Sequence, residues 1–253
     1  MSGTDSVAQQ LIVVVGAASG IGRGIAGALA VRGAELLLLD RDLEGAERVA
    51  ATLREDGGVV TAEHVDLTDE TSVEAAVNGC LERRGVPHGL VNSAGIPGPT
   101  GVPSHEFGVD RFDAVLGVNL RGAFLLSRAF IPPMLEAGYG RVVHLASIAG
   151  KDGNPNMIGY STSKAGLIGM VKAQGKEYAG TGVTINAVAP AVVMTEFVRE
   201  LPQETIDYMT DRIPMGRCGE VEEVAELVAW VVSPACSFTT GFTFDASGGR
   251  ATY

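Results

Sequence analysis

Short apolar runs alternate with helical patterns along most of the chain. We predict strands at the apolar runs 11–15, 35–40, 59–66, 88–95, 141–147, 183–190 and 240–247. Helical patterns lie between them, at 24–33, 43–56, 71–84, 109–132, 157–178 and 220–232. Repeated strand–helix alternation builds right-handed crossovers, which place parallel strands in one sheet with helices on both faces. The pattern therefore predicts an α/β, doubly wound fold with a seven-stranded, mainly parallel sheet, in one domain over residues 1–253.

The stretch 190–219 has no clear alternating pattern. It contains three prolines, although helical spacing returns near 203–212. An irregular segment of this length inside a compact domain is more often functional than slack chain. We expect it to be a loop region over a substrate site.

The charge of the chain limits its partners. Lys and Arg number 19 and Asp and Glu number 30, which gives a formal net charge of −11. An acidic surface repels phosphate backbones and no basic run interrupts it, so no nucleic acid is expected as a partner. The start, MSGTDSVAQQ, lacks the regions of a signal peptide, and the apolar runs are too short to span a bilayer. We expect a cytoplasmic protein with no membrane contact.

The cysteines and histidines show no metal-ligand spacing. The three cysteines are Cys80, Cys218 and Cys236, an odd number without a CxxC pair, which favours buried thiols in a reducing compartment. The four histidines are His64, His88, His105 and His144. Because they are not paired at metal-like spacing, no metal site is expected.

Three glycines, Gly16, Gly20 and Gly22, follow the first strand and open a helix in VVVGAASGIGRGIA. Glycines there allow a sharp turn and let a pyrophosphate approach the free N–H groups of the helix. A tight strand-to-helix turn uses glycines without any ligand too, so the motif alone leaves both readings open. No Gly-Lys-Ser/Thr follows, which excludes a Walker loop.

An acidic residue, Asp40, ends the second strand, 18 residues after Gly22. A carboxylate there can accept both adenosine ribose hydroxyls and would repel a 2′-phosphate, which favours NAD over NADP. Arg41 weakens the argument, because an arginine can grip that phosphate. Asp66 follows the third strand similarly. It could bond an adenine amino group or cap the next helix.

Two residues with acid–base chemistry, Tyr160 and Lys164, share one helix face at i and i+4. A phenol with a pKa near 10 is a poor base at neutral pH. A lysine ammonium about 5 Å away contributes roughly 3 kcal/mol to the phenolate at an effective dielectric of about 20. Such pairs are common on solvated helices, but Ser147 ends the fifth strand, at the edge where ligands bind. Asn119 is a polar residue in an apolar stretch. Its simplest role is structural, as a buried amide whose hydrogen bonds are all made within the fold.

Together these residues make the chain resemble the short-chain dehydrogenase/reductase family, from about residue 9 to 250. VGAASGIG resembles the family's cofactor glycine motif, and VNSAG, with Asn92, Ala94 and Gly95, its fourth-strand motif. The spacing of 13 residues from Ser147 to Tyr160 is typical. The resemblance implies a Rossmann-type domain with strand order 3-2-1-4-5-6-7.

The resemblance also implies a catalytic tetrad of Asn119, Ser147, Tyr160 and Lys164. Tyr160 would be the general acid or base, and Ser147 would orient the substrate oxygen. Lys164 would lower the pKa of the phenol and bind the nicotinamide ribose, and Asn119 would hold a water in a proton relay. The implied cofactor-binding residues are Gly16, Ser19, Gly20, Ile21, Gly22, Asp40, Arg41, Asp66, Leu67, Asn92, Ala94, Gly95, Tyr160, Lys164, Pro190, Val193 and Thr195.

Two positions depart from the family pattern. Val15 stands where threonine is usual, which removes a hydroxyl that helps to fix the turn. Ala191 stands where a glycine commonly follows the proline, which narrows the freedom of the backbone beside the nicotinamide. Neither touches the tetrad.

The ending SFTTGFTFDASGGRATY resembles that of dehydrogenases of 2-keto-3-deoxy sugar acids such as the rhamnonate and fuconate. The resemblance implies a small-molecule alcohol or ketone substrate, oxidised with NAD, and a homotetramer in which such a tail can reach a neighbouring subunit. A carboxylate substrate needs a cationic clamp. The candidates are Arg199, Arg212, Arg217 and Arg250, each of which could equally serve solubility.

Two other functions stay open. The central part also resembles 3-oxoacyl-[acyl-carrier-protein] reductases, whose acidic partner needs a basic patch, with Arg128 and Lys176 as candidates. Asp40 argues against it, because those reductases usually take NADPH. A non-catalytic NAD-binding sensor or scaffold would need neither Tyr160 nor Ser147. The sequence contains no GxSxG motif, the nucleophile elbow of α/β-hydrolases, so it does not indicate a hydrolase.

Overall fold

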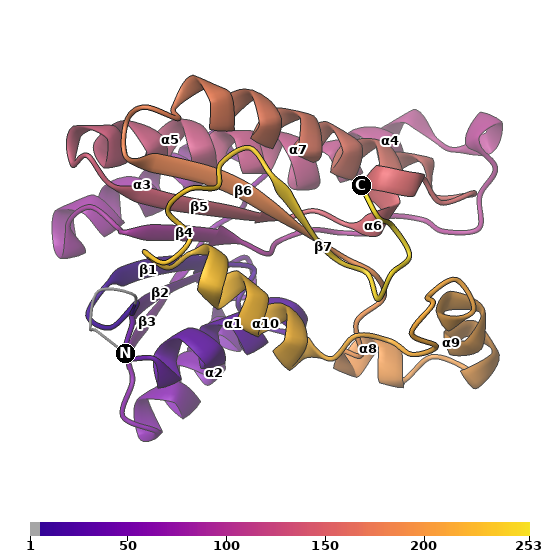
Figure 1. The fold of residues 1–253 in the computed structure, drawn as a ribbon, viewed down its shortest axis with the longest axis horizontal. Helices are drawn as coiled ribbons and strands as arrows, with labels where there is room; N and C mark the ends of the chain where they lie inside the picture. Colours follow the sequence, from indigo (N-terminus) through magenta and orange to yellow (C-terminus); the bar gives the residue numbers. More distant parts are fainter. Residues whose placement is uncertain (1–5) are drawn as a thin grey trace.

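The computed structural model describes residues 6–253 and centres on a sheet of seven strands (Figure 1). Their bounds are β1 Leu11–Val15, β2 Glu35–Asp40, β3 Val59–His64, β4 Gly89–Asn92, β5 Gly140–Leu145, β6 Val183–Pro190 and β7 Thr243–Ala246. The order β3-β2-β1-β4-β5-β6-β7 confirms the predicted Rossmann-type topology. Every pairing is parallel, where only a mainly parallel sheet was predicted. The winding reverses between β1 and β4, the place where such sheets bind ligands.

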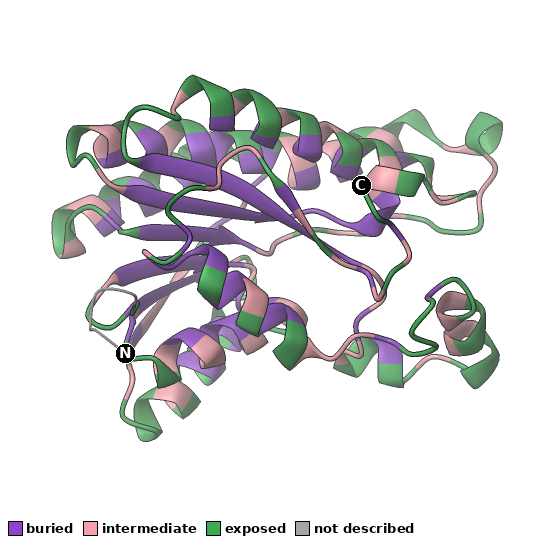
Figure 2. Cartoon of the chain, in the orientation of Figure 1, coloured by how far each residue is buried: buried purple, intermediate pink, exposed green. Residues whose placement is uncertain are grey.

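Helices cover both faces of this sheet (Figure 1). One face carries α1 Gly20–Val31, α2 Leu43–Glu55 and α10 Val221–Val231, and the other α3 Glu70–Arg84, α5 Gly122–Glu136 and α7 Ile158–Glu177. Ile12 and Val14 of β1 pack on the first set, and Val13 and Val15 on the second. Figure 2 shows the central strands buried. Because both faces are covered, these strands are continuous apolar runs.

The predicted helix from Val109 extends further than the sequence indicated. It consists of α4 Val109–Leu116, a π-helical turn η2 Gly117–Arg121, and α5. The predicted end near Pro132 is wrong, because Pro132 and Pro133 both lie inside α5. Ile131 and Met134 are buried beside them. This packing offsets the backbone bonds that the prolines lack.

By length and composition, this run, Val109–Glu136, could cross a membrane. The expectation that every apolar run is too short therefore fails for this one run. Half of its most apolar window is buried inside the fold. Phe130 and Leu126 of α5 are fully buried in the core cluster on that face of the sheet. The run is a core helix of the α/β domain.

The region 190–219 lies beyond the end of β6 and contains two short helices, α8 Glu196–Arg199 and α9 Gln203–Thr210. They project from the body at the lower right of Figure 1. The helical spacing near 203–212 corresponds to α9, whereas the single turn of α8 left no readable period. A further short helix, α6 Ile148–Asp152, follows β5, and η1 Ser104–Glu106 lies in the loop after β4.

The three cysteines, Cys80, Cys218 and Cys236, are all buried and free, as predicted. Burial raises the pKa of the Cys80 thiol to about 11, so this thiol is protonated and unreactive at neutral pH. In residues 6–253 no group of three or more His, Cys, Asp and Glu side chains could hold a metal ion. The expectation that the chain starts without a signal peptide concerns residues 1–10, and residues 1–5 lie outside the described range.

Candidate active site

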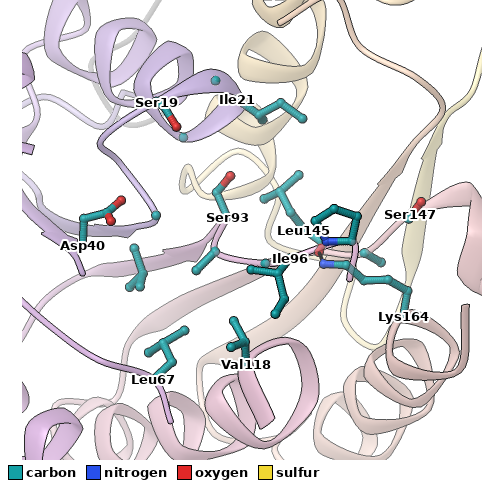
Figure 3. A pocket seen from close by; sticks show the side chains of 18 of the residues that line it. Ser19, Ile21, Asp40, Leu67, Ser93, Ile96, Val118, Leu145, Ser147 and Lys164 are labelled. Atoms are coloured by element: carbon teal, nitrogen blue, oxygen red, sulfur yellow. Dashed lines mark hydrogen bonds between the residues drawn. The ribbon is translucent and has the colours of Figure 1, made fainter. Parts of the chain in front are cut away.

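A cavity of about 460 Å³ opens at the carboxyl ends of the central strands. Its size suits a small-molecule or cofactor site. Figure 3 shows Asp40 toward one end and Ser147 and Lys164 toward the other, with Ile96, Val118 and Leu145 between. The cavity therefore joins the end of β2 to the end of β5, across the reversal between β1 and β4.

The glycines of the β1–α1 turn have different roles. Gly16 has φ +78°, and a Cβ there would lie 2.6 Å from the backbone nitrogen of Ala94. A Cβ at Gly22 would lie 1.9 Å from the carbonyl oxygen of Gly16. Gly20, with φ +52°, would meet only the side chain of Thr195, at 3.5 Å. Gly16 and Gly22 thus serve close packing, and Gly20 leaves the start of α1 open to a ligand.

The start of α1 offers free hydrogen-bonding groups. Ser19 is its N-cap residue, but the hydroxyl makes no capping bond. The first N–H groups of a helix lack intrahelical partners and favour anions. A pyrophosphate could bind here between Ser19 and Thr195, which lines the same cavity.

The carboxylate of Asp40, at the end of β2, is fixed by two backbone hydrogen bonds. One oxygen accepts a 2.9 Å hydrogen bond from the N–H of Ala18, and the other accepts one of 2.9 Å from Asp42. Asp40 and the neighbouring Arg41 both line the cavity. The carboxylate is therefore held against the glycine turn, facing the space that a cofactor would occupy.

Asp66 does not cap a helix. The N-cap of α3 is Asp69, whose side chain accepts from Thr71. Asp66 instead accepts from the N–H and the hydroxyl of Thr68, at 2.8 and 2.7 Å, and these bonds lower its pKa. The capping alternative is therefore wrong, and Asp66 is an ionised residue of the cavity wall.

Three of the four residues of the implied tetrad line the cavity. Ser147 lies two residues after the end of β5, as the N-cap of α6, and Tyr160 and Lys164 lie on α7. The ammonium of Lys164 donates a 2.6 Å hydrogen bond to the carbonyl of Leu145 and lies 5.8 Å from the centre of the Tyr160 ring. The phenol, the serine hydroxyl and the lysine thus come together from two elements that the fold places side by side.

The titration of this group differs from the sequence interpretation. Burial raises the pKa of Tyr160, and its hydrogen bond with Ser147 only partly opposes the rise. Burial also lowers the pKa of Lys164 to about 8. The predicted lowering of the Tyr160 pKa by Lys164 is therefore not what the chain alone produces. Burial disfavours the charged phenolate, and the ammonium of Lys164 points to the carbonyl of Leu145.

Asn119 lies behind the cavity wall, in the π-helical turn η2. Its side-chain oxygen accepts from the N–H of Ile96 at 2.8 Å, and its amide donates to the carbonyl of Ile96 and to Ser163 at 2.9 and 3.0 Å. Asn119 is therefore a buried amide with its hydrogen bonds made, which is the structural role that the sequence analysis left open for it. Both Asn119 and Lys164 approach Gly95, where a Cβ would meet them at 3.2 and 3.3 Å.

Two more predicted residues, Asn92 and Val193, do not line the cavity. Asn92 is buried and its oxygen accepts from the N–H of Ala94, which places the backbone beside Gly16. Val193 is buried and bridges to Gly219. Apart from these two and Asn119, all residues of the implied tetrad and cofactor site line the cavity.

Some lining residues had no signal in the sequence. Ile96, Pro97, Val118 and Ala146 are apolar residues that reach the cavity only through the path of the loops. Ala191, which departs from the family pattern, also lines it and donates to the carbonyl of Ala246 at 3.1 Å. It does not have a positive φ, so the missing glycine causes no backbone strain.

Three of the four candidate arginines are already paired with acids. Arg199 pairs with Glu220, Arg217 with both oxygens of Glu223, and Arg250 with Asp152. Arg212, two residues after the end of α9, donates to the hydroxyl of Tyr208 at 2.6 Å. Within residues 6–253 it is the one of the four without a salt bridge.

Comparisons with known proteins agree with this geometry. The family model described as Enoyl-(Acyl carrier protein) reductase matches residues 16–251. The chain is 47% identical over 244 residues to the 2-dehydro-3-deoxy-L-rhamnonate dehydrogenase (NAD(+)) of Sphingomonas sp. (strain SKA58), covering 95% of each chain. It is 38% identical to the cis-4-hydroxycyclohexanecarboxylate dehydrogenase of Sinomonas cyclohexanicum, over 97% and 98% of the two chains. The crystal structure of a 3-ketoacyl-(acyl-carrier-protein) reductase from Brucella melitensis complexed with NADH matches with a TM-score of 0.89 and 32% identity, over 98% and 100%.

Proposed function

The chain belongs to the short-chain dehydrogenase/reductase family, and on this premise we propose that it oxidises a secondary hydroxyl of a 2-keto-3-deoxy sugar acid with NAD. It is an NAD(P)-dependent oxidoreductase that acts on CH–OH groups of a small molecule. The observation that carries the substrate proposal is the 47% identity to a rhamnonate-series dehydrogenase along 95% of both chains.

The cavity fits a dinucleotide. The turn at Gly16 and Gly22 packs too closely for any side chain, while Gly20 leaves the first turn of α1 open. Ser19 and Thr195 would hold the phosphates, and Lys164 the nicotinamide ribose. A bound nicotinamide cofactor supplies hydride acceptance, or hydride donation in the reverse direction.

The chain itself handles the proton. As the carbinol C–H bond gives up hydride, the hydroxyl proton passes to the phenolate oxygen of Tyr160. Ser147 donates to the substrate oxygen and orients it. Lys164 carries positive charge below its pKa of about 8 and so favours the phenolate. Asn119 holds the loop at Ile96, which lines the cavity between its two ends.

Asp40 supports NAD as the cofactor. Asp40 lines the end of the cavity opposite Ser147 and Lys164, and its carboxylate could accept hydrogen bonds from the adenosine ribose hydroxyls. A 2′-phosphate placed there would meet a fixed carboxylate. Arg41, which could bind such a phosphate, lines the same cavity.

Arg212 is the best of the four candidates for the substrate carboxylate. A guanidinium that already pairs with an acid has little attraction left for a second carboxylate, and this applies to Arg199, Arg217 and Arg250. Arg212 belongs to the region 190–219, which borders the cavity through Ala191 and Thr195.

We also propose a homotetramer in the cytoplasm. Trp230 of α10, Phe244 of β7 and Phe242, just before β7, form a chain of edge-to-face aromatic contacts. Phe238, nearby in sequence, is fully exposed. Phe124 of α5 is also half exposed. Exposed aromatic surface of this kind favours association with other copies. Three free buried thiols suit a reducing compartment.

A spectrophotometric screen tests the proposed reaction. The purified chain is incubated with sugar acids, neutral secondary alcohols and acyl thioesters, each with NAD(H) and NADP(H). We expect the highest kcat/KM for a 2-keto-3-deoxy sugar acid with NAD. Turnover restricted to acyl thioesters with NADPH would instead identify a carrier-protein reductase.

That alternative rests on the similarity to the Brucella melitensis reductase. Docking of an acidic carrier protein needs free basic residues. Arg128, one of the two candidates, is paired with Glu70. Lys176 is exposed but stands on a chain of net charge −11.

A further inference from the structure

The carboxyl-terminal segment packs against the helix that begins at Ser147. Ser147 is the N-cap of α6, and its hydroxyl accepts a 3.1 Å hydrogen bond from the N–H of Ala149. At the other end of α6, Arg250 donates to Asp152 and Asn154, at 3.2 and 2.7 Å. The carboxyl terminus lies beside α6 in Figure 1. One end of this helix therefore carries an active-site hydroxyl, and the tail binds the other end.

Two further contacts hold the same end of α6. Tyr253 donates a 3.0 Å hydrogen bond to the carbonyl of Lys151, and its ring faces the Lys151 ammonium at 5.3 Å. Lys151 in turn donates to Asp245 of β7 at 2.9 Å. The side chains of Lys151 and Arg250 are only 6% and 13% exposed. Water screens these pairs less than it screens ordinary surface pairs.

On its other side α6 rests on α7, which carries Tyr160. A Cβ at Gly150 would lie 2.6 Å from the backbone carbon of Lys164. The helix therefore cannot approach α7 more closely. At its far end the N–H of Asn154 donates to the hydroxyl of Ser161 on α7 at 3.0 Å, and the tail contacts add the restraint on the side chains of Asp152 and Asn154. Removal of these contacts would let α6 move, and Ser147 would move with it.

We propose that Arg250 is a positioning residue for proton transfer: through Asp152 and Asn154 it fixes α6 and so sets the place of the Ser147 hydroxyl relative to Tyr160. This inference rests on the proposed function. Arg250 does not line the cavity and does not touch the substrate site. A displacement of about 1 Å at reacting groups can cost on the order of a hundredfold in rate.

Kinetics of Arg250→Met test this role. We expect kcat to fall about ten- to a hundredfold, with the cofactor Kd unchanged because the glycine turn is remote from the tail. The pH dependence of kcat should move upward, since the hydrogen bond with Ser147 lowers the pKa of Tyr160. Arg250→Lys keeps the charge but lacks the rigid fork that serves two acceptors, so it should restore kcat only in part.

Two controls separate positioning from general destabilisation. Arg84→Met removes a similarly sheltered arginine, 18% exposed, that pairs with Glu35 at the amino end of β2. It should leave kcat and its pH profile as in the wild type. The double variant Asp152→Asn with Arg250→Met should lose less kcat than the two single losses combined, because both substitutions remove the same contact. The inference is overturned if Arg250→Met matches Arg84→Met in kcat and pH profile.

Amide hydrogen exchange gives a readout that needs no substrate. In Arg250→Met the amides of residues 148–153 should exchange faster than in the wild type and in Arg84→Met, while those of α1 keep their rates. Unchanged exchange at 148–153 refutes the inference whatever the kinetics show. If the wild type oxidises no alcohol in the screen, the proposed function fails, and exchange still decides whether the tail holds the Ser147 helix.

Discussion

Nδ1 of His144 on β5 lies 3.4 Å from the side-chain nitrogen of Asn92, its register partner on β4. The other ring nitrogen lies 3.1 Å from the hydroxyl of Ser127. The amide nitrogen of Asn92 can only donate, so Nδ1 must accept and the ring must be neutral, with its proton on Nε2. Burial, with a smaller contribution from the charge of Lys164, lowers the pKa of His144 to about 3. This neutral ring holds Asn92, which orients the Ala94 backbone beside Gly16.

The low pKa of His144 predicts a loss of stability in acid. Between its unfolded value of 6.5 and about 3, the unfolded chain binds a proton that the folded chain does not. The free energy of unfolding should therefore fall by up to about 1.4 kcal/mol for each pH unit below 6.5. His144→Asn should lower stability at neutral pH but flatten this slope, as measured by urea denaturation across a pH series. His64→Asn, at an exposed histidine, should leave the slope unchanged; an equal slope in His144→Asn would contradict the prediction.

Replacement of Asp40 should narrow the preference for NAD. The carboxylate can make charge-assisted bonds to the ribose hydroxyls, and their loss should lower kcat/KM for NAD about tenfold or more. Asp40→Ala also removes the repulsion of a 2′-phosphate, so kcat/KM for NADP should rise. Asp56→Ala, an acid at the far end of α2, serves as the charge-matched control. An unchanged cofactor ratio in Asp40→Ala would show that Arg41 or another group sets the preference.

Loss of the phenol should abolish turnover without preventing cofactor binding. Tyr160→Phe removes one oxygen and keeps the ring, so the packing on α7 should change little. Loss of a general base typically costs about two to four orders of magnitude in kcat. Stopped-flow kinetics and cofactor affinity by fluorescence quenching measure the two effects, with Tyr178→Phe, at the end of the same helix, as the control. More than about a tenth of the wild-type kcat in Tyr160→Phe would mean that the proton goes elsewhere. Such a result would also favour a binding role over catalysis.

Removal of the Lys164 charge should affect both binding and catalysis. Lys164→Met keeps the apolar stem but loses the ammonium that is expected to bind the nicotinamide ribose, so cofactor affinity should weaken. The phenolate of Tyr160 loses a nearby positive charge, so the pH optimum of oxidation should move upward. Lys172→Met, an exposed lysine on the same helix, should do neither. A shift of the optimum to lower pH would be inconsistent with this role.

The proposed tetramer can be tested at its aromatic surface. Phe238→Asp places a charge in that surface and should shift the mass measured by light scattering toward a smaller species. Val59→Asp makes the same kind of change on β3, at the opposite edge of the sheet from β7, and should leave the mass unchanged. A wild-type chain that is monomeric at micromolar concentration would rule out the tetramer.

The fold was predictable because its signals are local. The strands inside the sheet are buried on both faces, so the clearest of them are apolar without interruption, as in LIVVV and ELLLLD. The position of Pro132 misled the prediction, since packing of Ile131 and Met134 on the sheet outweighs the preference of a proline for the end of a helix. Local propensity yields to tertiary burial at such points.

The sequence by itself determined which residues can carry chemistry: a turn of glycines at Gly16, an acid at Asp40, and the pair of Tyr160 and Lys164 one helical turn apart. These features depend on neighbours within a few positions, so they are visible in one dimension. Only the tertiary structure decided that Asn119 supports the wall of the cavity, that burial raises the pKa of Tyr160, and that Arg250 binds the helix of Ser147. Desolvation and contacts between distant segments depend on what surrounds a group in space, and chain packing alone fixes that.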